Sequence, residues 1–482
     1  MISKKLVSKV MLGLMLATPY TAFANSIGTV TVDGEQQSVN VNSDFSIGNS
    51  NNKVVQISSN SGYSLTIPNN TKGVINGEQI NFIGGLSVGS TSIAGATLNI
   101  GSAASDTVNI NGGSTDGIFV IRGHVDITAD NINISTNSDG AYGAIWIQNN
   151  TDSVTAPDNA ASVTLNGENI NITSNGLGLV AYSNSQLNIN GNLTATAPEL
   201  LSVRGNSTVK INADGTNTTK LNGDIDFNIT NDGNSGLKAN ANVNIKLTDE
   251  NSYFNGNIIK TYATNRDNDN VETGLANMTI EDMNLEISNG AQWNPTYVDE
   301  YTNTNSAQAM LAVNDLTSNN GIINLENMRD QELKVENISG YGLTVNVASS
   351  ENKLSFTESN SLNSLTVAAN QAYAEQLMQN DMGVSLQQLA NQVVDSSKQG
   401  NDKSAATNLY LAETAITGVT TAEVDENGKV VLNTVNERVN TSNDAISNMA
   451  SIALMAWRAE NDEMHQRMGE LRSSTGEAGI WA

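Results

Sequence analysis

The feature that most constrains the fold is a pattern of short apolar segments that returns along the chain. Leu179 and Leu201 stand at matching positions of two copies and lie 22 residues apart. Each copy has a short apolar segment, a polar turn, and a second segment whose apolar residues stand two positions apart. Two-residue alternation is typical of a strand with one buried face, so the pattern predicts repeated β-strands.

Four copies share this pattern, and they begin at Asp116, Gly178, Glu199 and Ser235. Their second strands contain the pairs Val125/Ile127, Leu187/Ile189, Val209/Ile211 and Val243/Ile245. A third strand precedes each copy, with the pairs Val108/Ile110, Ile170/Ile172, Leu193/Ala195 and Phe227/Ile229. A further copy with a longer loop contains Ile132/Ile134 and Gly143–Ile147.

Three short strands in a repeat of about 22 residues are typical of a parallel β-solenoid, in which equivalent side chains stack from one coil to the next. Asn, Thr, Ser and Asp fill most of the outward positions. A β-sandwich is the alternative, but it favours two-residue hairpin loops and a more aromatic core, and only 5% of this chain is aromatic. We therefore expect an all-β fold, a right-handed parallel β-helix over residues 25–365.

The pattern changes after about residue 350. Ser385–Gln388 (SLQQ) fits a helix capping box, with Leu386, Leu389 and Val393 on one helical face. We expect a small region of short helices and a hairpin over residues 366–432, with the hairpin turn at Asn427-Gly428. Apolar residues at three- and four-residue intervals then predict a long helix, with helical linker bounds of 433–472.

The first residues have the features of a secretory signal peptide. Lys4, Lys5 and Lys9 precede the short apolar segment Val10–Ala17. Ala22 and Ala24 then form a small-x-small cleavage site before Asn25. We therefore expect residues 1–24 to direct the chain to the Sec export machinery, and no later segment is long and apolar enough to be a transmembrane helix.

Charge and composition exclude several classes of function. The formal charge of −26 argues against a nucleic-acid partner. The chain has no cysteine, which excludes disulfides, thiolate catalysis and cysteine zinc sites. Asn265–Asn270 (NRDNDN) has the spacing of two calcium ligands but lacks the glycine and the glutamate that follow in a calcium loop. We therefore expect a polar surface loop there, and no metal or cofactor.

The sequence offers two alternatives in which the chain would be an enzyme. Gly233–Gly236 (GNSG) is superficially similar to the segment around a serine-protease nucleophile, but the only histidines are His124, expected in a turn, and His465, expected in the linker helix. Ser235 is equally explained as the start of a strand. The second alternative is a carbohydrate-active enzyme, for which charged side chains within two or three coils are candidates; these are Arg204, Lys210, Asp214, Asp224 and Asp226. Neither set of residues forms a recognisable catalytic arrangement in the sequence, so we expect no catalytic residues.

Aromatic residues supply one candidate surface contact. Trp293, Tyr297 and Tyr301 lie beside Pro295 in a segment expected to be a loop, which predicts an exposed aromatic patch. Trp146, by contrast, is expected in the core, and Trp457 in the mouth of a barrel or along the linker helix.

The C-terminal residues carry a resemblance to a known family. The motif Arg467, Met468, Gly469, Glu470, Leu471 and Arg472 is followed, after a short spacer, by Gly479-x-Trp481-Ala. With the signal peptide, the repeats and the helix, this resembles the autotransporters of type V secretion. The resemblance implies a β-helical passenger, a linker helix, and an outer-membrane β-barrel whose first residues would be 473–482. Leu316–Leu354 is also similar to the folding-nucleating end of such passengers.

The resemblance implies a non-enzymatic rod at the cell surface, used for adhesion or self-association. Its partners would be an outer-membrane barrel and a host glycan, a host protein or a second rod. We expect the DNA past Ala482 to encode that barrel; without a barrel, the rod would remain in the periplasm. Some family members cleave themselves at an Asn-Asn pair, where this chain has Asp462 and Glu463, so an attached passenger is expected. The alternatives are the carbohydrate-active enzyme or a truncated product without function. The ligand, the oligomeric state and the origin of the missing barrel stay open.

Overall fold

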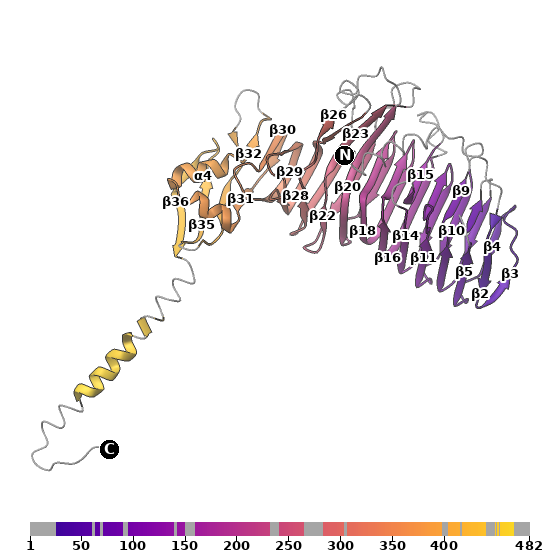
Figure 1. Ribbon diagram of the computed structural model, residues 1–482, viewed down its shortest axis with the longest axis horizontal. Coiled ribbons are helices and arrows are strands. Elements are labelled where there is room, and N and C mark those ends of the chain that lie inside the picture. The colour runs from indigo at the N-terminus through magenta and orange to yellow at the C-terminus, as the bar shows by residue number, and fades with distance from the viewer. Residues whose placement is uncertain are drawn as a thin grey trace, which may run out of the picture.

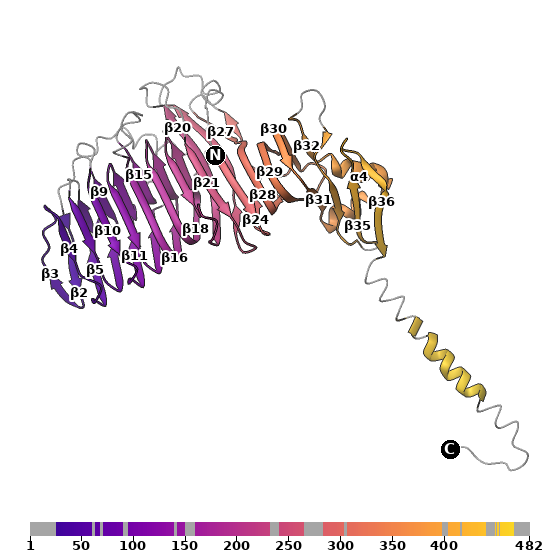
Figure 2. The ribbon, with the colours of Figure 1, turned by 180° about the vertical axis from the view of Figure 1, so that it is seen from behind.

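Strands make up most of the protein, and they form an elongated stack (Figures 1 and 2). The computed structural model describes residues 26–59, 63–67, 71–89, 95–138, 142–149, 160–231, 241–264, 283–302, 306–397, 403–414, 417–439, 449, 451–452 and 454–466. The predicted all-β class is therefore confirmed. Most neighbouring strands run parallel, whereas a β-sandwich has antiparallel ones, so the sandwich alternative is wrong.

The chain passes through three parallel sheets in turn. The first contains β4 (Phe45–Ile47), β7 (Lys72–Ile75), β10 (Thr97–Gly101), β13 (His124–Thr128), β19 (Thr208–Ile211), β21 (Asn242–Leu247), β24 (Met283–Ser288), β30 (Lys353–Leu362) and β32 (Val393–Asp395). Long strands contribute their first part to this sheet and continue into the next; they are β16 (Ser162–Ser174), β18 (Gln186–Arg204), β28 (Val313–Asn324) and β29 (Glu332–Val347).

The second sheet receives the later part of those long strands and the start of β20 (Thr219–Asn231). Its short strands are β5 (Val54–Ser58), β8 (Gln79–Ile83), β11 (Thr107–Asn111), β14 (Asn131–Thr136), β22 (Tyr253–Asn255), β25 (Gln292–Asn294), β31 (Leu365–Ala369) and β34 (Asn408–Leu411). The third sheet holds the ends of β18 and β20 with β6 (Leu65–Ile67), β9 (Leu86–Gly89), β12 (Ile118–Ile121), β15 (Gly143–Gln148), β17 (Leu177–Tyr182) and β23 (Ile258–Thr264).

Antiparallel strands lie at both ends of the stack. At the N-terminal end, β1 (Ser26–Ile27) pairs with β6, while β2 (Thr29–Val32) pairs with β5 and with β3 (Glu35–Gln37). Towards the other end, β23 pairs with β27 (Ser306–Met310), which pairs with β26 (Tyr301–Thr302). The last antiparallel strands are β33 (Lys403–Ser404), β35 (Thr417–Val424) and β36 (Val430–Val439).

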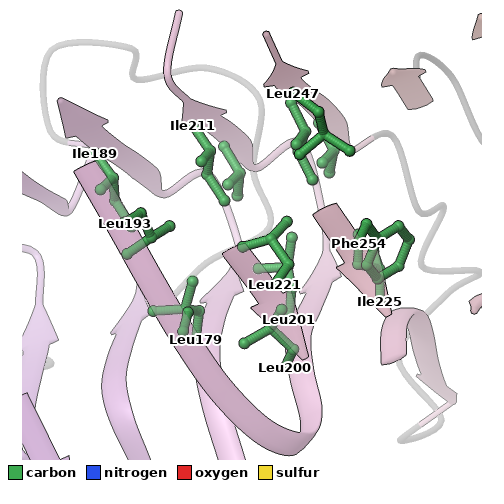
Figure 3. Packing of buried hydrophobic residues seen from close by; sticks show 14 of the residues in the cluster. Leu179, Ile189, Leu193, Leu200, Leu201, Ile211, Leu221, Ile225, Leu247 and Phe254 are labelled. Atoms are coloured by element: carbon green, nitrogen blue, oxygen red, sulfur yellow. The ribbon is translucent and has the colours of Figure 1, made fainter. Parts of the chain in front are cut away.

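Aliphatic side chains in register form the core. In the first sheet, Val125, Val163, Leu187, Val209 and Val243 occupy one register position on successive strands. All are fully buried, and their polar neighbours along each strand point outward, as the alternation predicts. Figure 3 shows buried leucine and isoleucine side chains of neighbouring coils gathered between the strands.

The predicted strand pairs match this register with one exception. Leu179 pairs with Leu201, so the 22-residue spacing is one turn of the stack. Phe227, however, pairs with Val203 in the third sheet, and its assignment to the same position as Leu193 is wrong. Thr219 pairs with Leu193 instead, and Leu221 pairs with Ala195. The alternation identifies a strand, but the register depends on the length of each turn.

One glycine explains how a long strand bends between sheets. Gly223 in β20 has φ +124°, and a Cβ atom there would approach the carbonyl oxygen of Ala197 to 1.8 Å. Only glycine fits this combination of left-handed backbone and close approach to the previous coil.

The region after the main stack differs from its predicted bounds. The boundary at residues 365/366 falls inside β31, which pairs with β29, so parallel pairing continues beyond it. Two short helices, α3 (Gln371–Leu377) and α4 (Met382–Ala390), are confirmed. Asp381 caps α4, accepting a hydrogen bond from Val384 N, so the capping box at Ser385 is wrong. Ser385 lies within α4, and Val393 lies in β32 instead of on the helix.

The hairpin turn at Asn427-Gly428 is confirmed between β35 and β36. The start of the predicted linker helix is wrong, because residues up to Val439 belong to β36. Backbone pairing of Thr417 with Val439 and of Thr420 with Glu437 holds this segment as a strand. After β36, the described helical residues are 449, 451–452 and 454–466, here called the C-terminal helix. It extends away from the stack in Figures 1 and 2.

The stack predicts opposite outcomes for two adjacent substitutions in β18. Leu193 is 1% exposed, whereas Thr194 faces solvent. Leu193→Ala leaves a cavity in the stacked core and should lower the free energy of unfolding by about 2–5 kcal/mol. Thr194→Ala, the matched control, should change it by less than about 0.5 kcal/mol. Urea unfolding followed by circular dichroism measures both; similar losses for the two variants would contradict the assigned orientation.

Candidate functional site

A row of asparagine side chains runs along the outside of the second sheet. The row consists of Asn222, Asn255, Asn294, Asn324 and Asn346, which occupy one register position on five successive strands. Asn255 Nδ2 donates to Asn222 Oδ1 at 2.9 Å, and Asn294 Nδ2 donates to Asn255 Oδ1 at 2.6 Å. Asn324 donates to Asn294 in the same way, and Asn346 to Asn324. We call these five residues the amide ladder.

The sequence places the amide ladder through the same alternation that fills the core. Phe254, Trp293 and Ile323 precede three of these asparagines and point inward, where they are fully buried. An amide group has two N–H donors and an oxygen with two lone pairs. Each inner member of the ladder uses one donor and one acceptor site along the row, so hydrogen-bonding capacity remains on the outer surface. These groups repeat about every 4.8 Å, the spacing of paired strands.

A second, shorter row lies nearer the N-terminal end. It contains Asn81, Asn109, Asn133 and Asn171, joined by hydrogen bonds of 2.8, 2.8 and 2.9 Å. Asn171 is exposed and the other three are half-buried. The alternation in the sequence predicts outward asparagines in general but not their alignment, because alignment depends on the register between coils.

The third sheet has a different outer surface, because its outward side chains are buried. Phe119, Trp146, Val180 and Tyr182 form a hydrophobic cluster on the outside of β12, β15 and β17. The Trp146 and Tyr182 rings meet edge to face with their centroids 5.7 Å apart. Trp146 is therefore buried, as predicted, but it packs in this outer cluster and not in the main core.

Buried polar groups continue this surface on β18 and β20. The Tyr182 hydroxyl and Ser202 Oγ are 2.8 Å apart, and the Arg204 guanidinium lies 4.1 Å above the Tyr182 ring. Burial raises the pKa of Tyr182, and the positive charge of Arg204 opposes this rise. Ser202 pairs in register with Asp226, and both are 0% exposed.

The charged residues weighed for a carbohydrate-active enzyme are only partly brought together. Arg204, Asp224 and Asp226 lie on the third sheet, but Lys210 lies in the first sheet and Asp214 in the turn that follows it. The two carboxylates and one cation that share the third sheet are not arranged along an open surface, because Asp226 has no exposed area and Arg204 is 8% exposed. A polysaccharide could not contact Asp226 in this conformation.

Asp116 is a buried carboxylate just before β12, a strand of the same third sheet. Its Oδ2 accepts from the Tyr63 hydroxyl at 2.8 Å, and its Oδ1 accepts from Gly143 N at 2.7 Å. Burial raises the pKa of Asp116 to about 7, although both hydrogen bonds favour the charged form. The Tyr63 ring stacks on Phe119 of the outer aromatic cluster. Through its hydrogen bond to the Tyr63 hydroxyl, Asp116 is therefore linked to that cluster.

The predicted aromatic patch is partly wrong. Trp293 is fully buried in β25, where its ring stacks on Phe254 with centroids 6.0 Å apart and its Nε1 donates to Gly256 O at 3.0 Å. The flanking Gln292 and Asn294 showed the strand alternation, but Pro295 favoured a loop. Tyr297 is 36% exposed and packs against Arg329, while Tyr301 is half-buried in β26. The three side chains therefore do not form a common exposed surface.

The described residues give little support to the serine-protease alternative. His124 is the first residue of β13, so its predicted turn position is wrong. Its Nδ1 lies 2.8 Å from Ser162 Oγ on the neighbouring strand, with both groups half-buried. His465 is exposed on the C-terminal helix, far along the chain from this pair. Within the described ranges, no group of three or more histidine, aspartate or glutamate residues could hold a metal ion.

Several predicted sites lie outside the described residues. They are the cleavage site at Ala22, Ala24 and Asn25, the segments at 233–236 and 265–270, and the junction residues Arg467–Arg472, Gly479 and Trp481. Of the helices that are described, none has the length and apolar character needed to cross a membrane. No protein-family model, curated protein or solved structure matches the chain.

Asp116 predicts a specific dependence of stability on pH. Its pKa is about 7 in the folded protein and near 3.8 in an unfolded chain. Between these values the folded state binds the proton more tightly, so this group's contribution to stability is present below about pH 4 and is lost as the pH rises to about 7. The loss is on the order of 4 kcal/mol.

The comparison variant is Asp116→Asn, which keeps an oxygen acceptor for Tyr63 without the titration. Urea unfolding at several pH values should show the stability of the parent falling relative to this variant between about pH 4 and pH 7. Parallel pH profiles for the two proteins would show that Asp116 titrates normally.

Proposed function

We propose that the chain is the passenger of a type V autotransporter: a right-handed parallel β-helix, exported and displayed at the cell surface, that acts by adhesion or self-association. Three features support the family assignment. They are the signal-like residues 1–24, the stack of parallel strands, and the exposed C-terminal helix that precedes the Arg467–Arg472 motif.

The β-helix part of the proposal follows from the order of the sheets. The chain visits the first, second and third sheets in the same order in successive turns, and each strand pairs with its equivalent in the next turn. Parallel strand connections are right-handed in about 98% of cases. A single coil of that hand accounts for the pairing pattern.

The amide ladder is the observation that carries the proposed activity. It presents the amide groups of five successive strands in one hydrogen-bonded row, with Asn255 exposed and the other four half-buried, and the core does not require asparagine at these positions. Hydroxyl-rich glycans and polar side chains of another rod are both suitable partners for repeated donors and acceptors. The carbohydrate-active alternative is less well supported, because Asp226 is buried and Lys210 and Asp214 lie away from the third sheet.

The adhesion proposal predicts the effect of removing the ladder. Asn255→Ala, Asn294→Ala and Asn346→Ala together remove three of its five amides and interrupt the row, while leaving the inward core residues in place. Self-association in sedimentation velocity, or binding to a glycan array, should fall at least tenfold. The expected loss arises because each deleted amide removes hydrogen bonds worth about 0.5–1.5 kcal/mol.

The matched control carries Asn109→Ala, Asn133→Ala and Asn171→Ala in the shorter row. It should retain association, and circular dichroism should show the same fold for both triple variants. Unchanged association of the ladder variant, or an equal loss in the control, would exclude the ladder as the contact surface.

The export proposal predicts a processing defect. A signal peptidase requires small residues at the positions of Ala22 and Ala24. Ala22→Asp with Ala24→Asp should therefore leave a larger precursor in the inner-membrane fraction, whereas the parent chain should be processed at Asn25. Cell fractionation and N-terminal sequencing distinguish the two; a parent chain that keeps Met1 would contradict export.

A further inference from the structure

Exposed large apolar side chains gather in two places near the C-terminal end. One is the C-terminal helix, where Met449, Ile452, Leu454, Met455, Trp457 and Met464 are all at least half exposed. The other lies beside α4, where Val384 is 65% exposed and Leu432 is 61% exposed. Exposed apolar area of this kind marks surfaces that another element covers.

Val384 and Leu432 line a hollow of about 810 Å³ between α4 and β36. Its polar rim includes Lys353, Lys429 and Gln387. Gln387 joins the two walls, because its Oε1 accepts from Val430 N at 3.1 Å and its Nε2 donates to Gly428 O at 2.9 Å. These hydrogen bonds fix the spacing of the two walls of the hollow, which is called the α4–β36 groove below.

The C-terminal helix has an apolar first half and an acidic second half. From Met449 to Trp457 every residue except Ser451 is apolar. Glu460, Asp462 and Glu463 follow, with Arg458 as the one basic residue between Trp457 and Glu463. Such an apolar segment is stable in water only when other groups cover it.

The groove and the helix have complementary charge. In a chain with a formal charge of −26, the groove is lined by two lysines, Lys353 and Lys429, and by one carboxylate, Asp381. The acidic half of the helix is therefore attracted to this part of the surface more than to the rest of the molecule.

The chain is long enough to bring the two together. Leu432 lies seven residues before Val439 in β36, a distance of about 24 Å along a strand. Nine residues connect Val439 to Met449, and they can span up to about 30 Å. Met449 can therefore reach the level of Leu432 without any change in β36.

We propose that the C-terminal helix has a second position, in which its apolar half lies in the α4–β36 groove of the same chain. In Figures 1 and 2 the helix stands away from the groove, and this is its extended position. Docking covers Leu454 and Trp457, which lie three residues apart on one side of the helix, together with Val384 and Leu432. It protects these side chains until another partner takes the helix. This inference does not depend on the proposed function.

The test uses the absence of cysteine from the chain. A Leu432→Cys and Leu454→Cys pair in the full chain should form a disulfide within one molecule under mild oxidation. The matched control, Leu432→Cys with Ile452→Cys, places the second thiol on the side of the helix away from Leu454 and Trp457 and should react at least tenfold more slowly. Non-reducing electrophoresis separates the cross-linked monomer from a dimer.

Equal rates for the two pairs would overturn the proposal, and so would a product that is only dimeric, because the occupant would then be a second copy. Trp457 fluorescence provides a measurement without cysteines. Leu432→Glu should shift the emission to longer wavelength by exposing Trp457, and the shift should vanish when Trp457→Phe is added. An unchanged emission in Leu432→Glu would also overturn the proposal.

Discussion

The structure depends on the stacking of aliphatic side chains between equivalent positions of successive turns. Val125, Val163, Leu187, Val209 and Val243 illustrate this contact, because each packs on the residue one turn before and one turn after. Stability is therefore distributed along the stack as a sum of neighbour contacts instead of residing in one central core. This arrangement explains how a long chain without cysteine can have an elongated shape.

The repeat was predictable because it depends on local alternation and on one clear spacing. Leu179 and Leu201 gave the length of a turn, and the valine and isoleucine pairs gave the strands. Register was less predictable where a turn is long, as the position of Phe227 shows. Trp293 was misassigned because a nearby proline outweighed the alternation of Gln292 and Asn294 around it.

Errors near the C-terminal end have a different physical cause. Val435 and Val439 fit a helical spacing, but pairing with β35 satisfies the backbone of this segment and fixes it as a strand. Ser385 fits a cap in the sequence, but α4 begins earlier, because Asp381 accepts the hydrogen bond of Val384 N and acts as the cap. The amide ladder could not be predicted at all, since it requires knowing which asparagines of different turns become neighbours. Local sequence determines which side chains point outward, and only the assembled stack determines which of them line up.

The reversed strands at the N-terminal end have a consequence for how copies can meet. β2 covers the edge of β5 and β1 covers the edge of β6, both in the antiparallel direction. Beyond β2, the outermost strand β3 presents only Glu35, Gln36 and Gln37, all exposed to water. A further molecule cannot continue the parallel hydrogen bonding of these two sheets from this end, because the strand direction has already been inverted there. Tip-to-tip growth of a fibre by parallel pairing of the second and third sheets is thereby disfavoured at this end.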